Sequence, residues 1–106
     1  MRDTLHNLEQ TIRQRRSADP SASYVAKLSA RGRAKIAQKV GEEAVETVIA
    51  AMADDREGAI GESADLIFHL MLLLADLDVP FDAVLDELDR REGVSGIAEK
   101  AARPTD

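Results

Sequence analysis

Two acidic clusters lie symmetrically about one point of the chain, and this symmetry favours a fold in which two long helices face each other. Glu43 and Glu46 form one cluster, Glu62 and Asp65 form the other, and Asp54 lies midway between them. Residues three apart share a face of an α-helix. If the chain reverses near Asp54, Glu46 lies opposite Glu62 and Glu43 opposite Asp65. We therefore expect four carboxylates between two antiparallel helices.

The apolar residues repeat with the period of an α-helix along most of the chain. The clearest series steps by four residues through Ile36, Val40, Ala44, Val48 and Met52. This spacing predicts helices over about residues 4–16, 24–28, 33–53, 56–77 and 82–91. No segment alternates as a strand would. The predicted fold class is all-α, an antiparallel helical bundle.

Capping and breaking residues mark the ends of these helices. The expected signals are Asp3 or Thr4 before the first helix, Ser21 or Ser23 before the second, Gly32 after it, Asp54-Asp55 at the turn and cap of 56–77, and Val79-Pro80 after that helix. In the last helix, Val84, Leu85 and Leu88 are expected to face inward.

The helix predicted over 56–77 needs more cover than one short chain provides. From Leu66 to Leu74 it is apolar nearly all round, and such a helix must be buried on every side. A chain of 106 residues buries a limited share of its surface. We expect one domain over 1–106, with a core of about 4–92 and a C-terminal segment, 93–106, that is at best partly ordered. A homodimer would complete the bundle.

Composition excludes several classes of function. A net charge of −6 and a pI near 4.9 argue against binding to nucleic acid or anionic membranes. Without cysteine there is no thiolate ligand or nucleophile. The N-terminus lacks the apolar core of a signal peptide, and the most apolar stretch, Leu66–Ala75, is too short to span a bilayer. A soluble, cytoplasmic protein is expected.

The acidic clusters can be explained either as a solvated helix surface or as a functional site. Acidic residues on a helix usually form a solvated face. Here, however, Glu43 and Glu46 flank apolar Ala44-Val45, and Asp65 directly precedes Leu66. Charges are rarely placed beside a core without a partner, so the pattern favours a cation site.

The ligand types restrict which cation fits. Oxygen ligands suit Mg²⁺, for which Mn²⁺ can substitute. A di-iron centre would require Glu-x-x-His motifs, whereas Ile49 follows Glu46 by three residues. His69 follows Asp65 by four, so it either orients that carboxylate or makes a single structural hydrogen bond, and the second is expected. His6 is expected at the surface.

Basic residues precede the first acidic cluster in an otherwise acidic chain. They are Lys27, Arg31, Arg33, Lys35 and Lys39. Such side chains can bind phosphate oxygens, although the alternative is a solvated face on which Lys39 pairs with Glu42 or Glu43. A second basic group, comprising Arg90, Arg91, Lys100 and Arg103, flanks the residues Gly93-Val94-Ser95-Gly96, whose backbone N–H groups could hold an anion.

Four segments carry a resemblance to a known family. The acidic residues from Glu42 to Asp65 resemble the motif of the all-α NTP pyrophosphatase (MazG-like) superfamily. Residues 23–28 (SYVAKL), 36–46 (IAQKVGEEAVE), 65–70 (DLIFHL) and 95–101 (SGIAEKA) resemble the phosphoribosyl-ATP pyrophosphohydrolases. The match extends from about Leu5 to Arg103. Val25 and Phe68 replace a threonine and a tyrosine that are usual in the family, and neither replacement touches a proposed ligand.

The resemblance implies a dimeric, Mg²⁺-dependent enzyme of histidine biosynthesis that hydrolyses phosphoribosyl-ATP to phosphoribosyl-AMP and pyrophosphate. It implies metal ligation by Glu43, Glu46, Glu62 and Asp65. Glu42 or Glu46 is the expected proton acceptor. The residues expected to bind the substrate are Lys27, Arg33, Lys35 and Lys39 at the triphosphate, with Arg91 and Lys100 at a ribose phosphate.

Two alternative functions remain open from the sequence. One is a house-cleaning pyrophosphatase of the same superfamily that cleaves aberrant nucleoside triphosphates with the same acidic motif. The other is a non-catalytic helical dimerisation module whose acidic face binds nothing.

Overall fold

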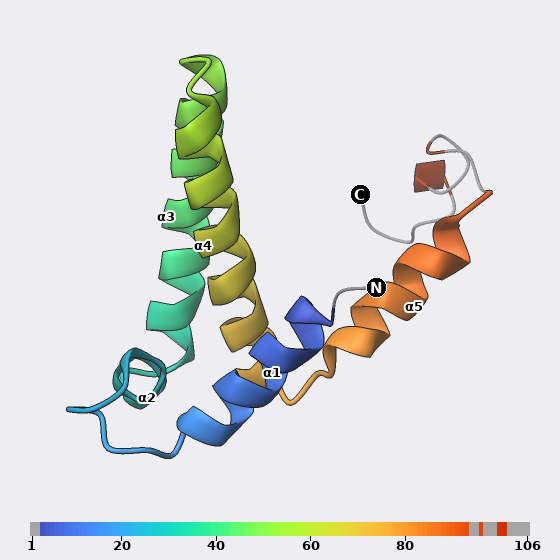
Figure 1. Cartoon of the computed structure of the whole chain (residues 1–106). Helices are drawn as coiled ribbons and strands as arrows, with labels where there is room; N and C mark the ends of the chain where they lie inside the picture. The colour runs from blue at the N-terminus through green and yellow to red at the C-terminus, as the bar shows by residue number, and fades with distance from the viewer. Residues whose placement is uncertain (1–2, 94–95, 97–99, 102–106) are drawn as a thin grey trace.

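The computed structural model describes residues 3–93, Gly96, Lys100 and Ala101, and it is helical (Figure 1). Its helices are α1 (Thr4–Arg15), α2 (Tyr24–Ala30), α3 (Arg33–Met52), α4 (Arg56–Asp76) and α5 (Phe81–Arg91). Within this part of the chain no strand forms. The prediction of an all-α fold is confirmed, and each predicted helix lies close to its expected bounds. Most of the C-terminal segment 93–106, predicted to be partly ordered, lies outside the described residues.

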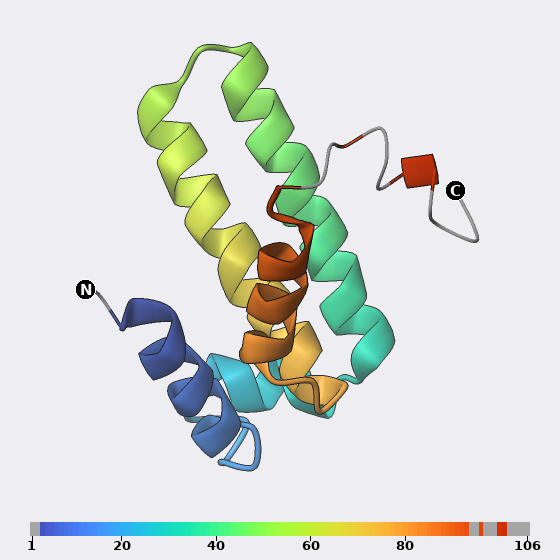
Figure 2. The ribbon, with the colours of Figure 1, turned by 90° about the vertical axis from the view of Figure 1, so that its right-hand side faces the viewer.

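Helices α3 and α4 form a long antiparallel hairpin that dominates the molecule (Figures 1 and 2). Its tip turns through Asp54, whose φ of 56° lies in the left-handed region that asparagine and aspartate tolerate. Asp55 then caps α4, because its Oδ1 accepts a hydrogen bond of 2.9 Å from the backbone N–H of Gly58. A Cβ atom at Gly58 would collide with this carboxylate. The predicted turn and cap are therefore confirmed.

The other caps follow the sequence less uniformly. The Ser23 hydroxyl accepts a hydrogen bond of 3.3 Å from the N–H of Ala26 and caps α2 as predicted. Gly32, with a φ of 95°, separates α2 from α3 in a conformation that favours glycine. At α1, by contrast, Asp3 is the N-cap residue but its side chain makes no capping hydrogen bond.

The hydrophobic core lies at the base of the hairpin, where α1 and α2 pack against it (Figure 2). Ile12 from α1, Ile36 from α3 and Leu72 from α4 are fully buried there. The rest of this cluster consists of Val25, Leu28, Met71 and Ala75. The base therefore anchors the two long helices, and it leaves their upper parts to face each other.

Asp76 ties three helices together at this base. Its Oδ2 accepts a hydrogen bond of 2.7 Å from Arg33 Nε on α3, and its Oδ1 lies 3.4 Å from Nη2 of Arg16, just after α1. Arg16 Nη1 also donates to the carbonyl oxygen of Ala75. Two guanidinium groups thus satisfy acceptors at the C-terminal end of α4, where positive charge is favoured.

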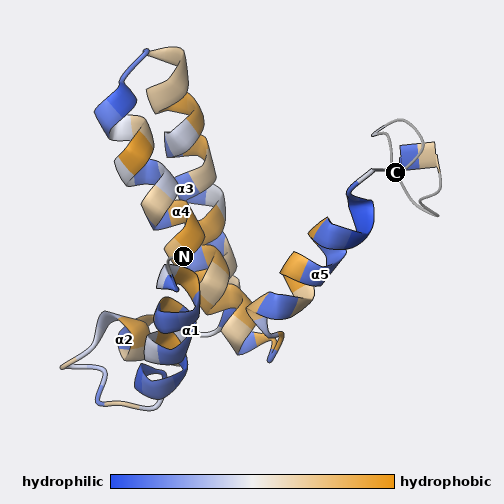
Figure 3. Ribbon diagram, turned by 45° about the vertical axis from the view of Figure 1, so that its right-hand side comes forward, coloured by the Kyte–Doolittle hydropathy of each residue, from blue (hydrophilic) through white to orange (hydrophobic). Residues whose placement is uncertain are grey.

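Helix α5 leaves the base and projects away from the hairpin (Figures 1 and 3). None of its residues is buried, and Leu88 is 57% exposed. The prediction that Val84, Leu85 and Leu88 face inward is wrong for Leu88 in this chain alone, whereas Val84 and Leu85 are half-buried. The helical period was interpreted correctly, but the described residues cover only part of its apolar face.

The start of α5 is held by α1. Glu9 accepts a hydrogen bond of 2.7 Å from the backbone N–H of Phe81, and His6 Nε2 lies 2.8 Å from Asp82 Oδ1. His6 is at the surface as predicted, but it has an acidic partner that the sequence did not indicate.

Apolar side chains are also exposed along the upper hairpin (Figure 3). The large ones are Val45, Val48, Ile49, Met52, Ile60 and Ile67, and Met52 is 83% exposed. Among the described helices, α4 has the length and composition of a membrane-crossing helix, with a mean hydropathy of 1.5, although core helices of soluble proteins share this property.

The cap at the hairpin tip yields a stability prediction. Asp55→Ala should lower the free energy of unfolding by about 1 kcal/mol, because the Gly58 N–H loses its acceptor. Urea denaturation followed by circular dichroism measures this loss. The neighbouring exposed residue gives the control, since Arg56→Ala should change stability by less than about 0.5 kcal/mol. Equal effects of the two substitutions would contradict the capping role.

Candidate functional site

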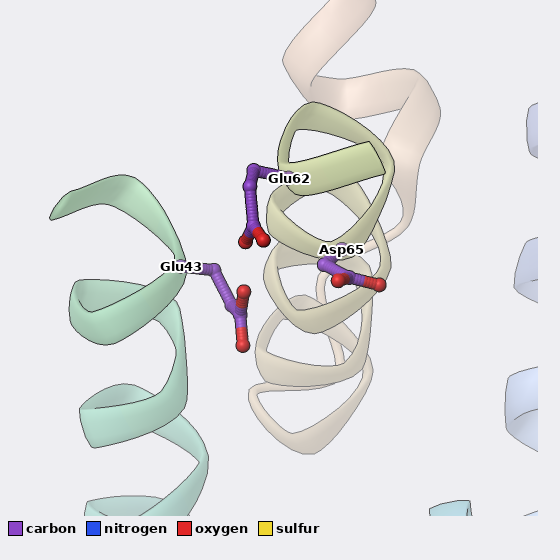
Figure 4. A group of neighbouring side chains, drawn as sticks. All are labelled: Glu43, Glu62 and Asp65. Atoms are coloured by element: carbon purple, nitrogen blue, oxygen red, sulfur yellow. The ribbon is translucent and has the colours of Figure 1, made fainter. Parts of the chain in front are cut away.

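Three carboxylates meet between the two helices of the hairpin (Figure 4). Glu43 projects from α3, and Glu62 and Asp65 project from successive turns of α4. One oxygen atom of each lies within 4.8 Å of the others. Figure 4 shows the carboxylates of Glu43 and Glu62 directed toward each other across the space between the helices. The antiparallel register that the sequence symmetry predicted therefore brings acids from both clusters together.

Two oxygen atoms of this group are buried without a hydrogen-bond donor. Glu43 is only 7% exposed, and its Oε2 has no partner among the described residues. Glu62 Oε2 is likewise buried and has no hydrogen-bond partner among the described residues. Burying an unpaired carboxylate oxygen is unfavourable, and a divalent cation would satisfy both atoms. The residues present therefore fit a hard, oxygen-ligated metal ion.

The acids also perturb one another electrostatically. A hydrogen bond to Glu46, burial, and a hydrogen bond to Glu43 together raise the pKa of Glu62 to about 7. In the absence of a cation, a proton thus relieves part of the repulsion between neighbouring carboxylates. A metal ion would replace that proton.

Glu46 borders this group without belonging to it. Its carboxylate is within hydrogen-bond reach of Glu62, as the predicted pairing of these two residues requires. The three-carboxylate group nevertheless contains Glu62 opposite Glu43, with Asp65 beside them, rather than a separate pair of Glu43 and Asp65. Glu46 is exposed and lines a cavity of about 260 Å³ together with Glu62.

A second pocket, rich in lysine, begins next to the acidic group. It has a volume of about 270 Å³ and is lined by Tyr24, Lys27, Leu28, Arg31, Lys35, Lys39 and Glu42. Lys39 connects the two parts, because its Nζ lies 3.4 Å from Glu42 Oε1 and 3.6 Å from Glu43 Oε1. The helix ion pairs that the sequence offered as an alternative for Lys39 do form, and the same lysine faces the pocket.

Glu42 differs from its acidic neighbours. It accepts a hydrogen bond of 3.0 Å from Gln38 Nε2, and this bond, with Lys39 nearby, lowers the pKa of Glu42. Its carboxylate therefore holds a proton less readily than an ordinary glutamate.

The structure does not bring all the predicted phosphate-binding residues to this pocket. Arg33 lies at the base of the hairpin, paired with Asp76 at 2.7 Å. Arg91 is on the projecting α5 and donates to Glu87 Oε2 at 2.9 Å. Lys100 is exposed, and neither it nor Arg91 lines the pocket.

Two residues connect the pocket to Asp65, and the sequence indicated neither the role of Tyr24 nor its pairing with His69. Tyr24 lines the pocket, and its hydroxyl oxygen lies 2.8 Å from His69 Nε2. His69 therefore makes two hydrogen bonds rather than the single one predicted, the other joining Nδ1 to the carbonyl oxygen of Asp65 at 2.7 Å. No local feature of the sequence indicates that Tyr24 and His69 are partners, because they lie 45 residues apart.

A group of carboxylates that fits a divalent cation, beside a lysine-lined pocket in an α-helical hairpin, is typical of enzymes that act on phosphate compounds. Comparison with family models gives the particular family. Residues 5–92 match the model described as phosphoribosyl-ATP pyrophosphohydrolase, and the chain belongs to this family. The resemblance noted in the sequence is thereby confirmed.

Curated relatives agree with this assignment. The chain is 71% identical to a phosphoribosyl-ATP pyrophosphatase of Rhizorhabdus wittichii, over 98% of each chain. It is 69% identical to the protein of the same name from Novosphingobium aromaticivorans, over 95% of this chain and 94% of the relative. A third protein of this name, from Zymomonas mobilis, is 62% identical to the chain over 96% of this chain and 95% of the relative.

The raised pKa of Glu62 yields a prediction about pH and stability. Because this pKa is about 7 in the folded protein and 4.5 for an ordinary glutamate, the protonated form stabilises the metal-free fold below pH 4.5, and this contribution is lost as the pH rises through 7. Glu62→Gln mimics the protonated form at every pH. In EDTA at pH 8 the variant should therefore unfold at a higher temperature than the unaltered protein.

Magnesium should reverse that order, since it stabilises only a protein that can bind it. Differential scanning fluorimetry with and without Mg²⁺ at pH 8 measures both effects. An equal Mg²⁺-induced rise in the unfolding temperature of the two proteins would contradict metal binding by Glu62.

Proposed function

We propose that this chain hydrolyses phosphoribosyl-ATP to phosphoribosyl-AMP and pyrophosphate, the second step of histidine biosynthesis, in the cytoplasm. The observation that carries the proposal is the group of Glu43, Glu62 and Asp65, in which Glu43 is buried, directly beside a pocket lined by lysines. Membership of the phosphoribosyl-ATP pyrophosphohydrolase family supports the choice of substrate.

The carboxylates would hold Mg²⁺, with Mn²⁺ as a substitute. Glu43 reaches the site from α3, and Glu62 and Asp65 reach it from α4. Glu46, next to Glu62, would supply a fourth carboxylate. When bound, such an ion offsets the charge of phosphate oxygens and of the departing pyrophosphate.

The lysine-lined pocket would bind the triphosphate. Lys27, Lys35 and Lys39 face it from α2 and α3, and Arg31 joins them from the connection between these helices. Ammonium groups bind phosphate oxygens as compact point charges, so three of them can follow a flexible triphosphate chain. Arg33, paired with Asp76, is not part of this proposed clamp.

Glu46 is the better candidate of the two acids for accepting a proton from the attacking water. Glu42 has a lowered pKa and engages Gln38 and Lys39, which makes it a weaker base. Glu46 is exposed beside the metal-binding carboxylates. As the water oxygen bonds to phosphorus and its proton passes to Glu46, the bond between the α- and β-phosphates breaks and pyrophosphate leaves.

The proposed enzyme is a homodimer in which a second copy covers the upper hairpin. In the described part of the chain, large apolar residues of α3 and α4 are exposed there, including Met52 and Ile60 at 83% and 73%. The apolar face of α5 buries no residue either. Exposed apolar surface of this extent is typical of a protein interface.

Activity measurements test the proposed catalytic acid. Pyrophosphate release from phosphoribosyl-ATP with Mg²⁺ should fall about 100-fold or more in Glu46→Gln, since both a proton acceptor and a ligand are lost. Glu57→Gln is the matched control, because Glu57 is an exposed acid in the first turn of α4 and should be dispensable. Full activity of Glu46→Gln would refute its role.

The same assay separates the proposed substrate from the alternatives. The unaltered protein should release pyrophosphate from phosphoribosyl-ATP at a far higher kcat/KM than from a panel of nucleoside triphosphates. Release from the panel but not from phosphoribosyl-ATP would indicate a house-cleaning pyrophosphatase. The absence of release from every nucleotide would indicate a non-catalytic module.

Sedimentation equilibrium tests the dimer. The chain mass is 11.5 kDa, and the particle should have twice this mass. Met52→Glu places a charge in the proposed interface and should yield monomers, whereas Gln14→Glu, on the exposed side of α1, should leave the mass unchanged. A monomeric unaltered protein would contradict the proposed assembly.

A further inference from the structure

Two successive hydrogen bonds connect the lysine-lined pocket with the backbone of Asp65, one of the three residues of the carboxylate group. The Tyr24 hydroxyl oxygen lies 2.8 Å from His69 Nε2, and His69 Nδ1 lies 2.7 Å from the carbonyl oxygen of Asp65. A carbonyl oxygen can only accept, so Nδ1 carries the proton. In the neutral ring Nε2 is then an acceptor, and the Tyr24 O–H donates to it. In both hydrogen bonds, a donor therefore faces an acceptor.

Ring packing holds both side chains in place, and His69 is also buried. His69 is 6% exposed, so a ring nitrogen without a partner there would be unfavourable. The Tyr24 ring packs against Phe68 with ring centres 6.0 Å apart, and His69 meets both of these rings edge-on. The orientation of the Tyr24 hydroxyl toward His69 is therefore supported by two ring contacts of Tyr24 as well as by the hydrogen bond.

These two hydrogen bonds join two helices that have different tasks in the proposed reaction. Helix α2 carries Lys27 to the pocket, while the turn of α4 that contains Asp65 belongs to the carboxylate group. Helix α2 packs mainly on α1 and α3, and its Val25 and Leu28 belong to the core cluster that α4 shares. Among the described residues, the Tyr24–His69 bond is the one side-chain hydrogen bond between α2 and α4.

We propose that Tyr24 and His69 are positioning residues whose hydrogen bond sets the distance between the phosphate-binding Lys27 and the metal-binding Asp65. This inference rests on the proposed function, because it assigns the pair a task in placing the triphosphate relative to the carboxylates. Tyr24 is 49% exposed and lines the pocket, so the bound substrate would lie against the element that the pair holds.

The first test is Tyr24→Phe, which keeps the ring and its packing but removes the O–H. The buried His69 Nε2 then loses its donor, and α2 loses its bond to α4. We expect kcat for phosphoribosyl-ATP to fall about tenfold or more, with a change in KM of less than about threefold, since misplacement affects the reacting geometry more than ground-state binding. Mg²⁺ affinity, measured by calorimetry without substrate, should stay within about twofold because neither residue is a ligand.

A rescue experiment separates positioning from a merely structural role. In His69→Gln, the side-chain amide offers one acceptor and one donor with a spacing similar to that of the imidazole nitrogens, so kcat should be largely retained. In His69→Leu both bonds are lost, and kcat should fall as far as in Tyr24→Phe. The double variant with Tyr24→Phe and His69→Leu should lose no more kcat than either single variant, because both residues act through one hydrogen bond.

Several results would overturn the inference. They are kinetic constants of Tyr24→Phe equal to those of the unaltered protein, additive losses in the double variant, or a loss of kcat that matches the loss of folded protein measured by circular dichroism. These outcomes presuppose an active unaltered enzyme. If the unaltered protein released no pyrophosphate from phosphoribosyl-ATP, the proposed function itself would fail, which is a distinguishable result.

Discussion

Repulsion between carboxylates across the α3–α4 hairpin is the interaction on which the account of this molecule depends. Glu43 and Glu62 each bury an oxygen atom that no donor among the described residues reaches, and one oxygen atom of Asp65 lies within 4.8 Å of an oxygen atom of each. Two helices that meet in this way are pushed apart unless a proton or a cation intervenes. The pKa of about 7 at Glu62 shows how strongly the metal-free site already favours a proton. A bound cation would relieve this repulsion, so the arrangement fits a metal-binding site.

The rest of the fold allows this unfavourable contact to persist. Ile12, Ile36 and Leu72 form a fully buried core at the base of the hairpin, and Asp76 adds ion pairs to Arg16 and Arg33 there. At the opposite end, the tip is fixed by a capped turn. The carboxylates lie between these two anchored ends, so their separation is set by elements that do not take part in the chemistry. Pre-organisation of this kind is what positions a ligand set before its ion arrives.

Much of this arrangement could be predicted from the sequence because its causes are local. Helical periodicity, the turn at Asp54-Asp55 and the symmetry of the acids about it together specify an antiparallel pair with acids between them. What the sequence did not reveal depends on residues far apart in the chain. Arg33 looked like a phosphate-binding residue but pairs with Asp76, and the partnership of Tyr24 with His69 has no local signature. The prediction that Leu88 of α5 faces inward was wrong for a related reason, since helical periodicity indicates an apolar face but not which residues cover it.

The central claim is that α3 and α4 together hold one divalent cation, and a crystal grown with Mn²⁺ tests it most directly. The anomalous difference map should contain a peak between the two helices, with oxygen atoms of Glu43, Glu62 and Asp65 in its coordination sphere. The same peak should be absent from crystals of Glu43→Gln. Manganese bound elsewhere, or no bound manganese in crystals of a protein that releases pyrophosphate, would contradict the account.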